Sequence, residues 1–308
     1  MVDLEALVAL VKGAPGLLGK RDLELVTRLD ADLDGDDGAL IAHGDGFFVT
    51  CGEAISPPFL LADPFGAGSA AVVTNVSDVR AMGARPHGIV DMLVAPDKDF
   101  ANTVLDGLNW ASDLLGVPVL GGHLTLGHPP ALSATATGFT TAPLRAGAAQ
   151  PGDTLLAAFA TDGRYMNETN DFFTALRDRP KERLRTDGEA LVEVAEQGFA
   201  HAARDISMPG IAGSLLQMIE GAGVGATLDL DAIPKPEDTP LERWLLTFPS
   251  FGFLLAGDER AIKPFTDRGL VCAPCGTFDA TRQLKLQSGG KTAVAWDLNA
   301  TPLTGLGR

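Results

Sequence analysis

The chain has 308 residues, of which 45% are hydrophobic and 21% are charged, and it contains 36 glycines. This composition is typical of a folded α/β-type protein and excludes a disordered or fibrous one. Forty acidic residues against twenty-four basic ones give a formal charge of −16, which repels nucleic acid backbones and anionic lipid. No apolar run approaches the roughly 18 residues of a membrane span. We therefore expect no nucleic-acid partner, no membrane partner and a cytoplasmic location.

The first residues, "MVDLEALVALVKG", predict an amphipathic helix capped by Asp3. They begin acidic and lack a basic n-region, so they do not have the pattern of a signal peptide. The cysteines, Cys51, Cys272 and Cys275, are few and odd in number, which fits a reducing compartment. Cys272 and Cys275 form a C-x-x-C pair, which alone leaves a zinc site or a plain strand and turn open. The apolar "GLVCAPCGTF" around the pair favours the strand and turn.

Strands and helices alternate through the first half of the chain. The periodicity predicts strands over 38–43 and 46–52, a helix over 63–82, a strand over 86–94, a helix over 100–115, and strands over 117–122 and 131–141. A break rich in Gly, Ala and Pro follows and predicts a domain boundary near residue 149. We expect an N-terminal domain over 1–149 and a C-terminal domain over 150–308.

The second half repeats the mixture of helices and strands. Its pattern predicts helices near 187–200 and 209–220, strands over 224–230 and 251–257, and a helix after residue 257. A closing hairpin over 282–298 turns at Gly289-Gly290. Both halves therefore indicate mixed α and β structure.

The helix predicted over 63–82 carries unusual polar residues. Asp63 is a natural N-cap, and a proline occupies the first helical position. Asn75 and Asp78 are three apart on an otherwise small and apolar helix, so they share one face. A carboxylate there is costly unless it is compensated. An ion pair with Arg80 or Arg85, or partial exposure to water, would reduce this cost, and a bound cation is the alternative.

Carboxylates crowd the stretch before this helix. An Asp/Gly-rich turn that exposes its charges accounts for Asp32, Asp34 and Asp45. It fits Asp36 and Asp37 less well, because they run straight into a strand. Mg²⁺ takes oxygen ligands, keeps water and substrate phosphates in its shell, and needs only one or two carboxylates per ion. The acids between residues 31 and 53 are Asp32, Asp34, Asp36, Asp37, Asp45 and Glu53. The predicted metal ligands are Asp36, Asp37, Glu53 and Asp78.

Two glycine-rich segments are candidates for phosphate or ligand contact. "GAPGLLGKR" lacks the spacing of a phosphate loop, but backbone N–H groups and Lys20 could still cover phosphates. His123 follows a short strand and Gly121-Gly122, where a side chain and bare backbone can meet a ligand. A loop histidine with a purely structural role is the alternative.

The order of the motifs carries a resemblance. "GDDGAL", "FFVTCGE", "DPFGAGSAAVVTNVSDVRAMGARP", "VLGGH" and "PGDTLL" together resemble the ATP-binding superfamily of aminoimidazole ribonucleotide (AIR) synthase, also called PurM-like. The superfamily includes selenophosphate synthetase, thiamine-monophosphate kinase and HypE. "DISMPGIAGSLLQMIEGAGVGATLDL" resembles the start of its C-terminal domain.

The resemblance implies a two-domain α+β fold in which the N-terminal sheets of two subunits pair in a homodimer. It also implies Mg-ATP in a cleft near that interface, and motif matching passes metal or nucleotide roles to Asp36, Asp37, Asp78 and His123. Lys20 is a weaker transfer. We place His123 and Asp78 at the catalytic centre. The predicted nucleotide contacts are Lys20, Asp36, Asp37, Asn75, Gly121 and Gly122.

Two departures separate the chain from the relatives' pattern. A T-D or T-T-D element is replaced by Thr50-Cys51-Gly52-Glu53, so one metal ligand is lost or moved to Glu53. An S-D-G-G-type turn is replaced by Ser207-Met208-Pro209-Gly210, which removes an acid from the expected acceptor side.

We expect an ATP- and Mg²⁺-dependent enzyme that phosphorylates or activates a small-molecule acceptor, the acceptor lying near Asp162, Arg164 and Asp205. A catalytically reduced nucleotide-binding or scaffolding homologue is the first alternative. An acidic metal-binding module without nucleotide is the second.

Overall fold

The computed structural model describes residues 2–29, 35–166, 168 and 171–307, so Asp32 and Asp34 lie outside the described residues. The chain forms two compact units. Unit 1 comprises Met1–Asp36, Leu144–Arg179 and Glu193–Arg308, and unit 2 comprises Asp37–Pro143 and Pro180–Val192. Each unit is therefore built from more than one stretch of the sequence. The domain boundary near residue 149 stays a prediction.

Unit 2 is built on a five-stranded sheet in the order β1-β2-β5-β3-β4. Its neighbours pair antiparallel, except for the parallel pair β3 and β4. The strands are β1 (Ala39–His43), β2 (Gly46–Ala54), β3 (Arg85–Ala95), β4 (Val119–Leu126) and β5 (Ala131–Thr140). The helices are α3 (Pro57–Ala62), α4 (Pro64–Ala81), α5 (Lys98–Leu115) and α6 (Lys181–Asp187). The predicted elements of this region are confirmed, with β4 longer than expected.

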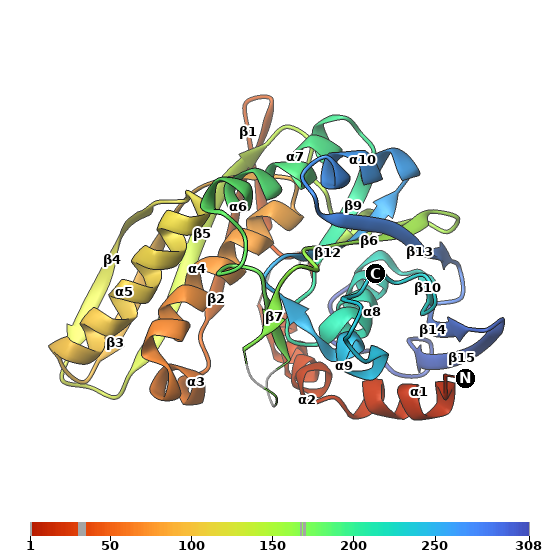
Figure 1. Cartoon of the computed structure of the whole chain (residues 1–308), viewed down its shortest axis with the longest axis horizontal. Helices are drawn as coiled ribbons and strands as arrows, with labels where there is room; N and C mark the ends of the chain where they lie inside the picture. Colours follow the sequence, from red (N-terminus) through yellow and green to blue (C-terminus); the bar gives the residue numbers. More distant parts are fainter. Residues whose placement is uncertain (1, 30–34, 167, 169–170, 308) are drawn as a thin grey trace. The chain divides into compact units, whose positions relative to one another are not determined.

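Helices α4 and α5 lie side by side on one face of this sheet (Figure 1). The predicted start of α4 is confirmed, because the Asp63 carboxylate accepts a hydrogen bond from the Gly66 N–H at 2.8 Å. Alternation along β3 buries Ile89 and Leu93 and leaves Val90 and Met92 exposed on the opposite face. One face of the sheet therefore forms a core with the helices, and the other is left apolar and open.

Unit 1 holds a seven-stranded mixed sheet in the order β15-β14-β10-β13-β6-β12-β9 and a small sheet in the order β11-β8-β7. The large sheet contains β6 (Thr154–Phe159), β9 (Ala200–Asp205), β10 (Gly225–Asp229), β12 (Gly252–Gly257), β13 (Val271–Asp279), β14 (Gln283–Ser288) and β15 (Lys291–Asp297). The small sheet contains β7 (Arg164–Tyr165), β8 (Phe172–Thr174) and β11 (Phe248–Pro249). The predicted hairpin is confirmed, since β14 and β15 join through Gly289-Gly290.

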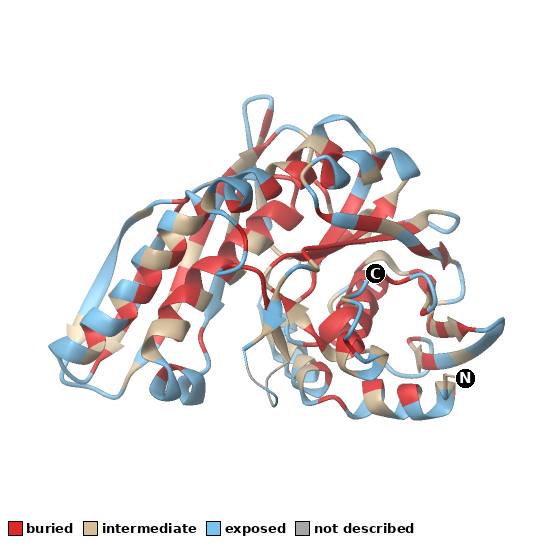
Figure 2. Ribbon diagram, viewed as in Figure 1, coloured by how far each residue is buried: buried red, intermediate tan, exposed pale blue. Residues whose placement is uncertain are grey.

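Helix α8 is the central helix of unit 1, and Figure 2 shows it as an almost continuously buried element. The helices of this unit are α1 (Leu4–Gly13), α2 (Pro15–Leu18), α8 (Gly210–Ala222), α9 (Leu241–Leu246) and α10 (Ile262–Thr266), with the short 3₁₀ helices η1 (Gly19–Arg28), η2 (Ala146–Ala148) and η3 (Glu259–Ala261). Asp3 caps α1 as predicted, accepting from the Ala6 N–H at 3.1 Å. The helix predicted near 187–200 is confirmed as the shorter α7 (Glu189–Glu196), since α6 ends at Asp187 and β9 begins at Ala200.

The C-x-x-C pair lies inside β13. Cys272 and Cys275 are both buried and unpaired, and burial raises the pKa of the Cys272 thiol to about 12. Cys275 belongs to the hydrophobic core of unit 1. Within the described residues, neither cysteine joins a group of three or more metal-ligating side chains. The pair therefore packs as part of a strand. In the same described ranges, no helix has both the length and the apolar character needed to cross a bilayer.

Candidate active site

The acidic centre of unit 2 is the pair Asp37 and Asp78. Asp37 directly precedes β1, and Asp78 lies on α4 with only 7% of its surface exposed. One carboxylate oxygen of each approaches the other within 4.8 Å. Two negative charges that close repel one another, and a divalent cation between them offsets the repulsion. The structure thus brings together two of the four predicted metal ligands.

Cys51 lies beside this pair, on the face of β2 that packs against α4. Its thiol donates to the Asn75 carbonyl at 3.4 Å and to the Asn75 side-chain oxygen at 3.5 Å. Burial, followed by the charges of Asp78, Glu53 and Asp37, raises the pKa of the thiol. Cys51 therefore stays protonated and neutral among three acids. Glu53 is exposed at the same end of β2, close enough for its charge to act on the thiol.

Asn75 is completely buried. Its amide nitrogen donates to the Ala71 carbonyl at 2.8 Å, and its carbonyl oxygen faces the Cys51 thiol. Both ends of the side chain are therefore occupied, the nitrogen within α4 and the oxygen by Cys51 of β2. Nucleotide binding by Asn75 remains a prediction that this geometry does not support.

The arginines considered as partners for Asp78 interact with a different segment. Arg80 is buried, and the nearest acids acting on its guanidinium are Glu189 and Asp187. Desolvation lowers the pKa of Arg80 to about 10 in spite of those two charges. The Arg85 Nε lies 3.0 Å from a Glu189 carboxylate oxygen. The two arginines thereby attach residues 187–189 to the rest of unit 2.

Asp36 belongs to unit 1, whereas Asp37 belongs to unit 2. The Asp36 carboxylate forms an ion pair with Arg145. Arg145 Nε lies 3.4 Å from Asp36 Oδ2. The preceding residue, Gly35, has a φ of +72°, a conformation that a glycine adopts at little cost. Its carbonyl accepts from Arg204 Nη1 at 2.7 Å, and a side chain at Gly35 would meet Leu306 at 3.5 Å. The turn around Asp36 is thus held by Arg204 of β9, and it lies beside Leu306 in the segment after β15.

That last segment is held by a buried carboxylate. Glu220 on α8 is 5% exposed and accepts hydrogen bonds from the Leu303 N–H at 2.7 Å and the Thr304 N–H at 2.9 Å. The Thr304 hydroxyl donates at 2.6 Å, and the Gly305 N–H donates at 3.4 Å. Four donors make Glu220 a fully compensated clamp for residues 303–305.

His123 lies inside β4, so the prediction that it follows the strand is wrong. The parallel pairing with β3 continues past the two glycines and sets His123 opposite Met92. Its ring is exposed, with Nε2 at 3.2 Å from Thr125 Oγ1. Alternation puts it on the face of the sheet opposite α4 and α5, whereas Asp78 lies on the helix side. Within one chain, His123 and the acidic pair therefore occupy different faces.

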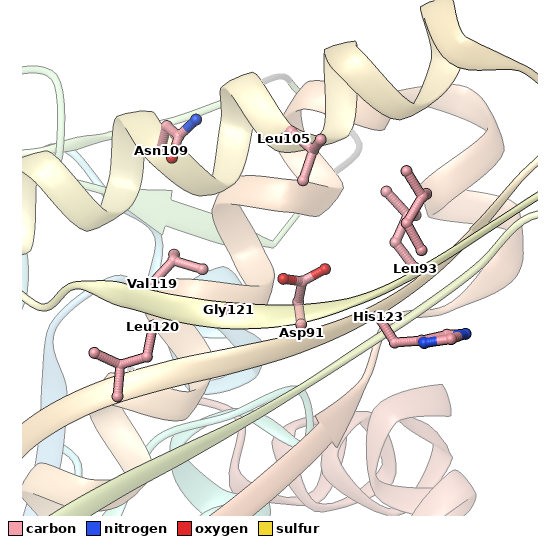
Figure 3. Close-up of a pocket in the computed structure, with 10 residues that line it drawn as sticks. Asp91, Leu93, Leu105, Asn109, Val119, Leu120, Gly121 and His123 are labelled. Atoms are coloured by element: carbon pink, nitrogen blue, oxygen red, sulfur yellow. The ribbon is translucent and has the colours of Figure 1, made fainter.

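A cavity of about 360 Å³ opens beside Gly121 and Gly122. It lies between α5 and the edge strand β4, and Figure 3 shows Asp91 pointing into it while the His123 ring points away. Asp91 was not singled out in the sequence, where it reads as one acid within the apolar strand "PHGIVDMLV". A single acid in an apolar run is the sequence signal that could have identified Asp91 as a candidate binding residue.

The remaining predicted residues all lie in unit 1. Lys20 is half-buried in η1, and within the described residues no hydrogen bond or ion pair engages it. Asp162 accepts from the buried Arg179 Nη1 at 2.7 and 2.8 Å, and Arg164 lies 3.2 Å from Asp178. Asp205 is buried at the end of β9. The acceptor site stays a prediction.

The donor set of unit 2 fits a hard cation. Asp37 and Asp78 offer carboxylate oxygens, and the adjoining thiol is protonated and hence a poor ligand. Magnesium prefers such oxygen ligands and completes its shell with water or phosphate.

Comparisons with known proteins agree with this architecture. The N-terminal domain model described as AIR synthase related protein matches residues 35–140, and the corresponding C-terminal domain model matches residues 152–289. An uncharacterized Synechocystis protein, sll0787, is 33% identical over 94% of this chain and 94% of its own length. Selenide, water dikinase of Aeromonas salmonicida is 29% identical over 78% of this chain and 72% of its own.

Among solved structures, AaThiL complexed with AMPPCP and TMP superposes with a TM-score of 0.67 at 18% identity, covering 87% of this chain and 91% of that one. This likeness shows the fold. The two family models together span most of the chain. The chain therefore belongs to the AIR synthase-related family and has its two-domain, PurM-like α+β fold.

Proposed function

We propose that this protein is an ATP- and Mg²⁺-dependent enzyme that transfers the γ-phosphoryl group to a small-molecule acceptor, or uses it to activate an acceptor oxygen. The observation that carries the proposal is the approach within 4.8 Å of the Asp37 carboxylate and the carboxylate of Asp78, which lies on the mostly buried helix α4. Family membership supports it, because relatives include selenide, water dikinase, and AaThiL was solved with the nucleotide analogue AMPPCP.

Each predicted residue has a role in this proposal. Asp37 and Asp78, with Glu53 at the same end of β2, would hold Mg²⁺ through carboxylate oxygens. Bound Mg²⁺ neutralises phosphate charge and so favours phosphoryl transfer. Lys20 offers an ammonium group for phosphate oxygens, in keeping with its lack of an internal partner in the described chain.

We also propose a homodimer that covers the open face of the unit 2 sheet. Ile41, Phe48, Val90 and Met92 lie on that face, and each is more than one third exposed. Contiguous exposed apolar side chains are typical of protein interfaces. Such a dimer would bury His123, and in this arrangement we propose a catalytic or nucleotide contact for His123. Three unpaired cysteines support a cytoplasmic location.

The alternative, a nucleotide-binding homologue with reduced turnover, is favoured by one observation. Cys51 lies in the Thr50-Cys51-Gly52-Glu53 element, where the family resemblance implies an acid, and its protonated thiol adds no negative charge to the site. A missing carboxylate weakens the hold on a second metal ion, which phosphoryl transfer commonly uses.

Calorimetry followed by a turnover screen separates these functions. Isothermal titration of the wild-type protein with ATP should show binding in the presence of Mg²⁺ and much weaker binding in EDTA. Release of ADP or phosphate in a screen of small acceptors would then support the enzyme, and binding without release under any acceptor would support the alternative. Absence of Mg²⁺-dependent binding would exclude both.

A further inference from the structure

Asp91 occupies a cradle formed by its neighbour on β4. Its Cα pairs in register with Gly122, and a side chain at Gly122 would come within 2.3 Å of Asp91 Oδ1. The adjoining Gly121 has a φ of +152°, which other residues rarely adopt. Gly122 thus keeps one side of the Asp91 carboxylate clear of other side chains.

The carboxylate of Asp91 has little internal compensation. The residue is 6% exposed, and within the described residues its carboxylate bonds only to its own backbone. Burial raises the pKa of Asp91, and the backbone bond offsets that only in part. Buried carboxylates in folded proteins are normally paired or hydrogen-bonded. An acid in this situation costs stability, which is a known mark of binding groups.

The cavity in front of Asp91 is mostly apolar. Leu93, Leu105 and Val119 contribute hydrocarbon walls, and Asn109 on α5 supplies a carboxamide (Figure 3). The other titratable lining residue, His123, points its ring away from the cavity. Among the described residues that line the cavity, none is Lys or Arg. The pocket therefore combines one buried acid, one amide and apolar surface.

We propose that this pocket binds a small organic monocation, an amine or amidinium on an apolar body, with Asp91 as its counter-ion and Asn109 as a second hydrogen-bonding group. An anionic ligand would meet the Asp91 charge in a chain of formal charge −16. Mg²⁺ retains much of its water shell, and the hydrocarbon walls of Leu93, Leu105 and Val119 offer that shell no hydrogen-bonding groups. A neutral apolar ligand would leave the acid uncompensated. The inference does not depend on nucleotide turnover.

The test uses benzamidinium as the probe and neutral benzamide as its isosteric control, in titration calorimetry with the full chain. The wild-type protein should bind benzamidinium and show at least about tenfold weaker binding of benzamide, because a charge-assisted hydrogen bond is lost. Asp91→Asn should weaken benzamidinium binding by a similar factor. Asp106→Asn, an exposed acid on α5 outside the pocket, should bind like wild type.

Gly122→Ala supplies a second, independent variant. The added methyl group would come within 2.3 Å of Asp91 Oδ1 and 2.4 Å of the Asp91 carbonyl oxygen, so both the carboxylate and the strand would shift. Benzamidinium affinity should therefore fall while the acid itself is retained. The proposal is overturned if benzamidinium at about 10 mM, which would reveal even millimolar affinity, does not bind the wild type. Equal binding to wild type and Asp91→Asn would overturn it as well, as would equal binding of benzamide and benzamidinium.

Discussion

Glu220 in unit 1 and Asp91 in unit 2 are buried to the same degree, at 5% and 6% exposure, but their surroundings differ completely. Glu220 accepts four hydrogen bonds from residues 303–305, whereas Asp91 bonds only to its own backbone in the described chain and faces a cavity. Burial alone therefore does not tell a structural acid from a binding acid. The hydrogen bonds that each acid receives make the distinction. The fold satisfies the Glu220 carboxylate, whereas the Asp91 carboxylate has room for a ligand.

The largest effect should come from breaking the compensated acid. Glu220→Ala leaves the Leu303 and Thr304 N–H groups buried without an acceptor, at about 1–3 kcal/mol for each unsatisfied group. We expect the midpoint of thermal unfolding to fall by roughly 10 °C. Calorimetry or circular dichroism checks this, with the exposed Glu259→Ala as control. Equal melting of the two variants would contradict the clamp.

The uncompensated acid should behave in the opposite way. Asp91→Asn removes a charge that burial in the folded state disfavours, so the melting temperature should rise by a few degrees at neutral pH. The folded pKa of Asp91 is raised, so the wild type loses stability as pH rises from about 4, the ordinary pKa of Asp, through the folded value. The gain from Asn should therefore vanish in acid. A gain that persists there, or a destabilised variant, would refute this assignment.

The smallest expected effect concerns Cys51. This thiol is a neutral group among acids, and it extends the comparison of the two buried carboxylates. Its raised pKa predicts that iodoacetamide labels the native protein at pH 8 far more slowly than the urea-unfolded chain. Cys51→Ser keeps a neutral donor near Asn75 and should alter stability by only about 1 kcal/mol. Peptide mass spectrometry after timed labelling provides the readout. Rapid native labelling of Cys51 would show that the thiol is not held protonated beside Asp37 and Asp78.

Local signals allowed much of the fold to be predicted. Asp63 with the following proline fixed the start of α4, and Gly289-Gly290 between alternating runs fixed the β14–β15 turn. Both are short-range features, decided by backbone hydrogen bonds and turn geometry within a few residues. The pairing of Asp37 with Asp78 also followed from sequence, because unmatched carboxylates next to apolar elements are rare.

Features set by distant partners were not predictable. Gly121-Gly122 resembles the end of a strand, but pairing with β3 carries β4 onward and turns His123 to the other face of the sheet. The donors that satisfy Glu220 lie more than eighty residues later in the chain. Arg80 and Arg85 likewise interact with acids far along the chain, at residues 187 and 189. Tertiary contacts of this kind override local patterns.

The most direct test of the proposed function is the Mg²⁺ dependence of nucleotide affinity in Asp78→Asn. This substitution keeps the size of the side chain and removes one of the two charges that approach within 4.8 Å. Titration calorimetry with a non-hydrolysable ATP analogue should show affinity about 10- to 100-fold below wild type in Mg²⁺ and a reduced difference between Mg²⁺ and EDTA. Asp106→Asn should match wild type. Unchanged affinity and unchanged Mg²⁺ dependence in Asp78→Asn would contradict the account.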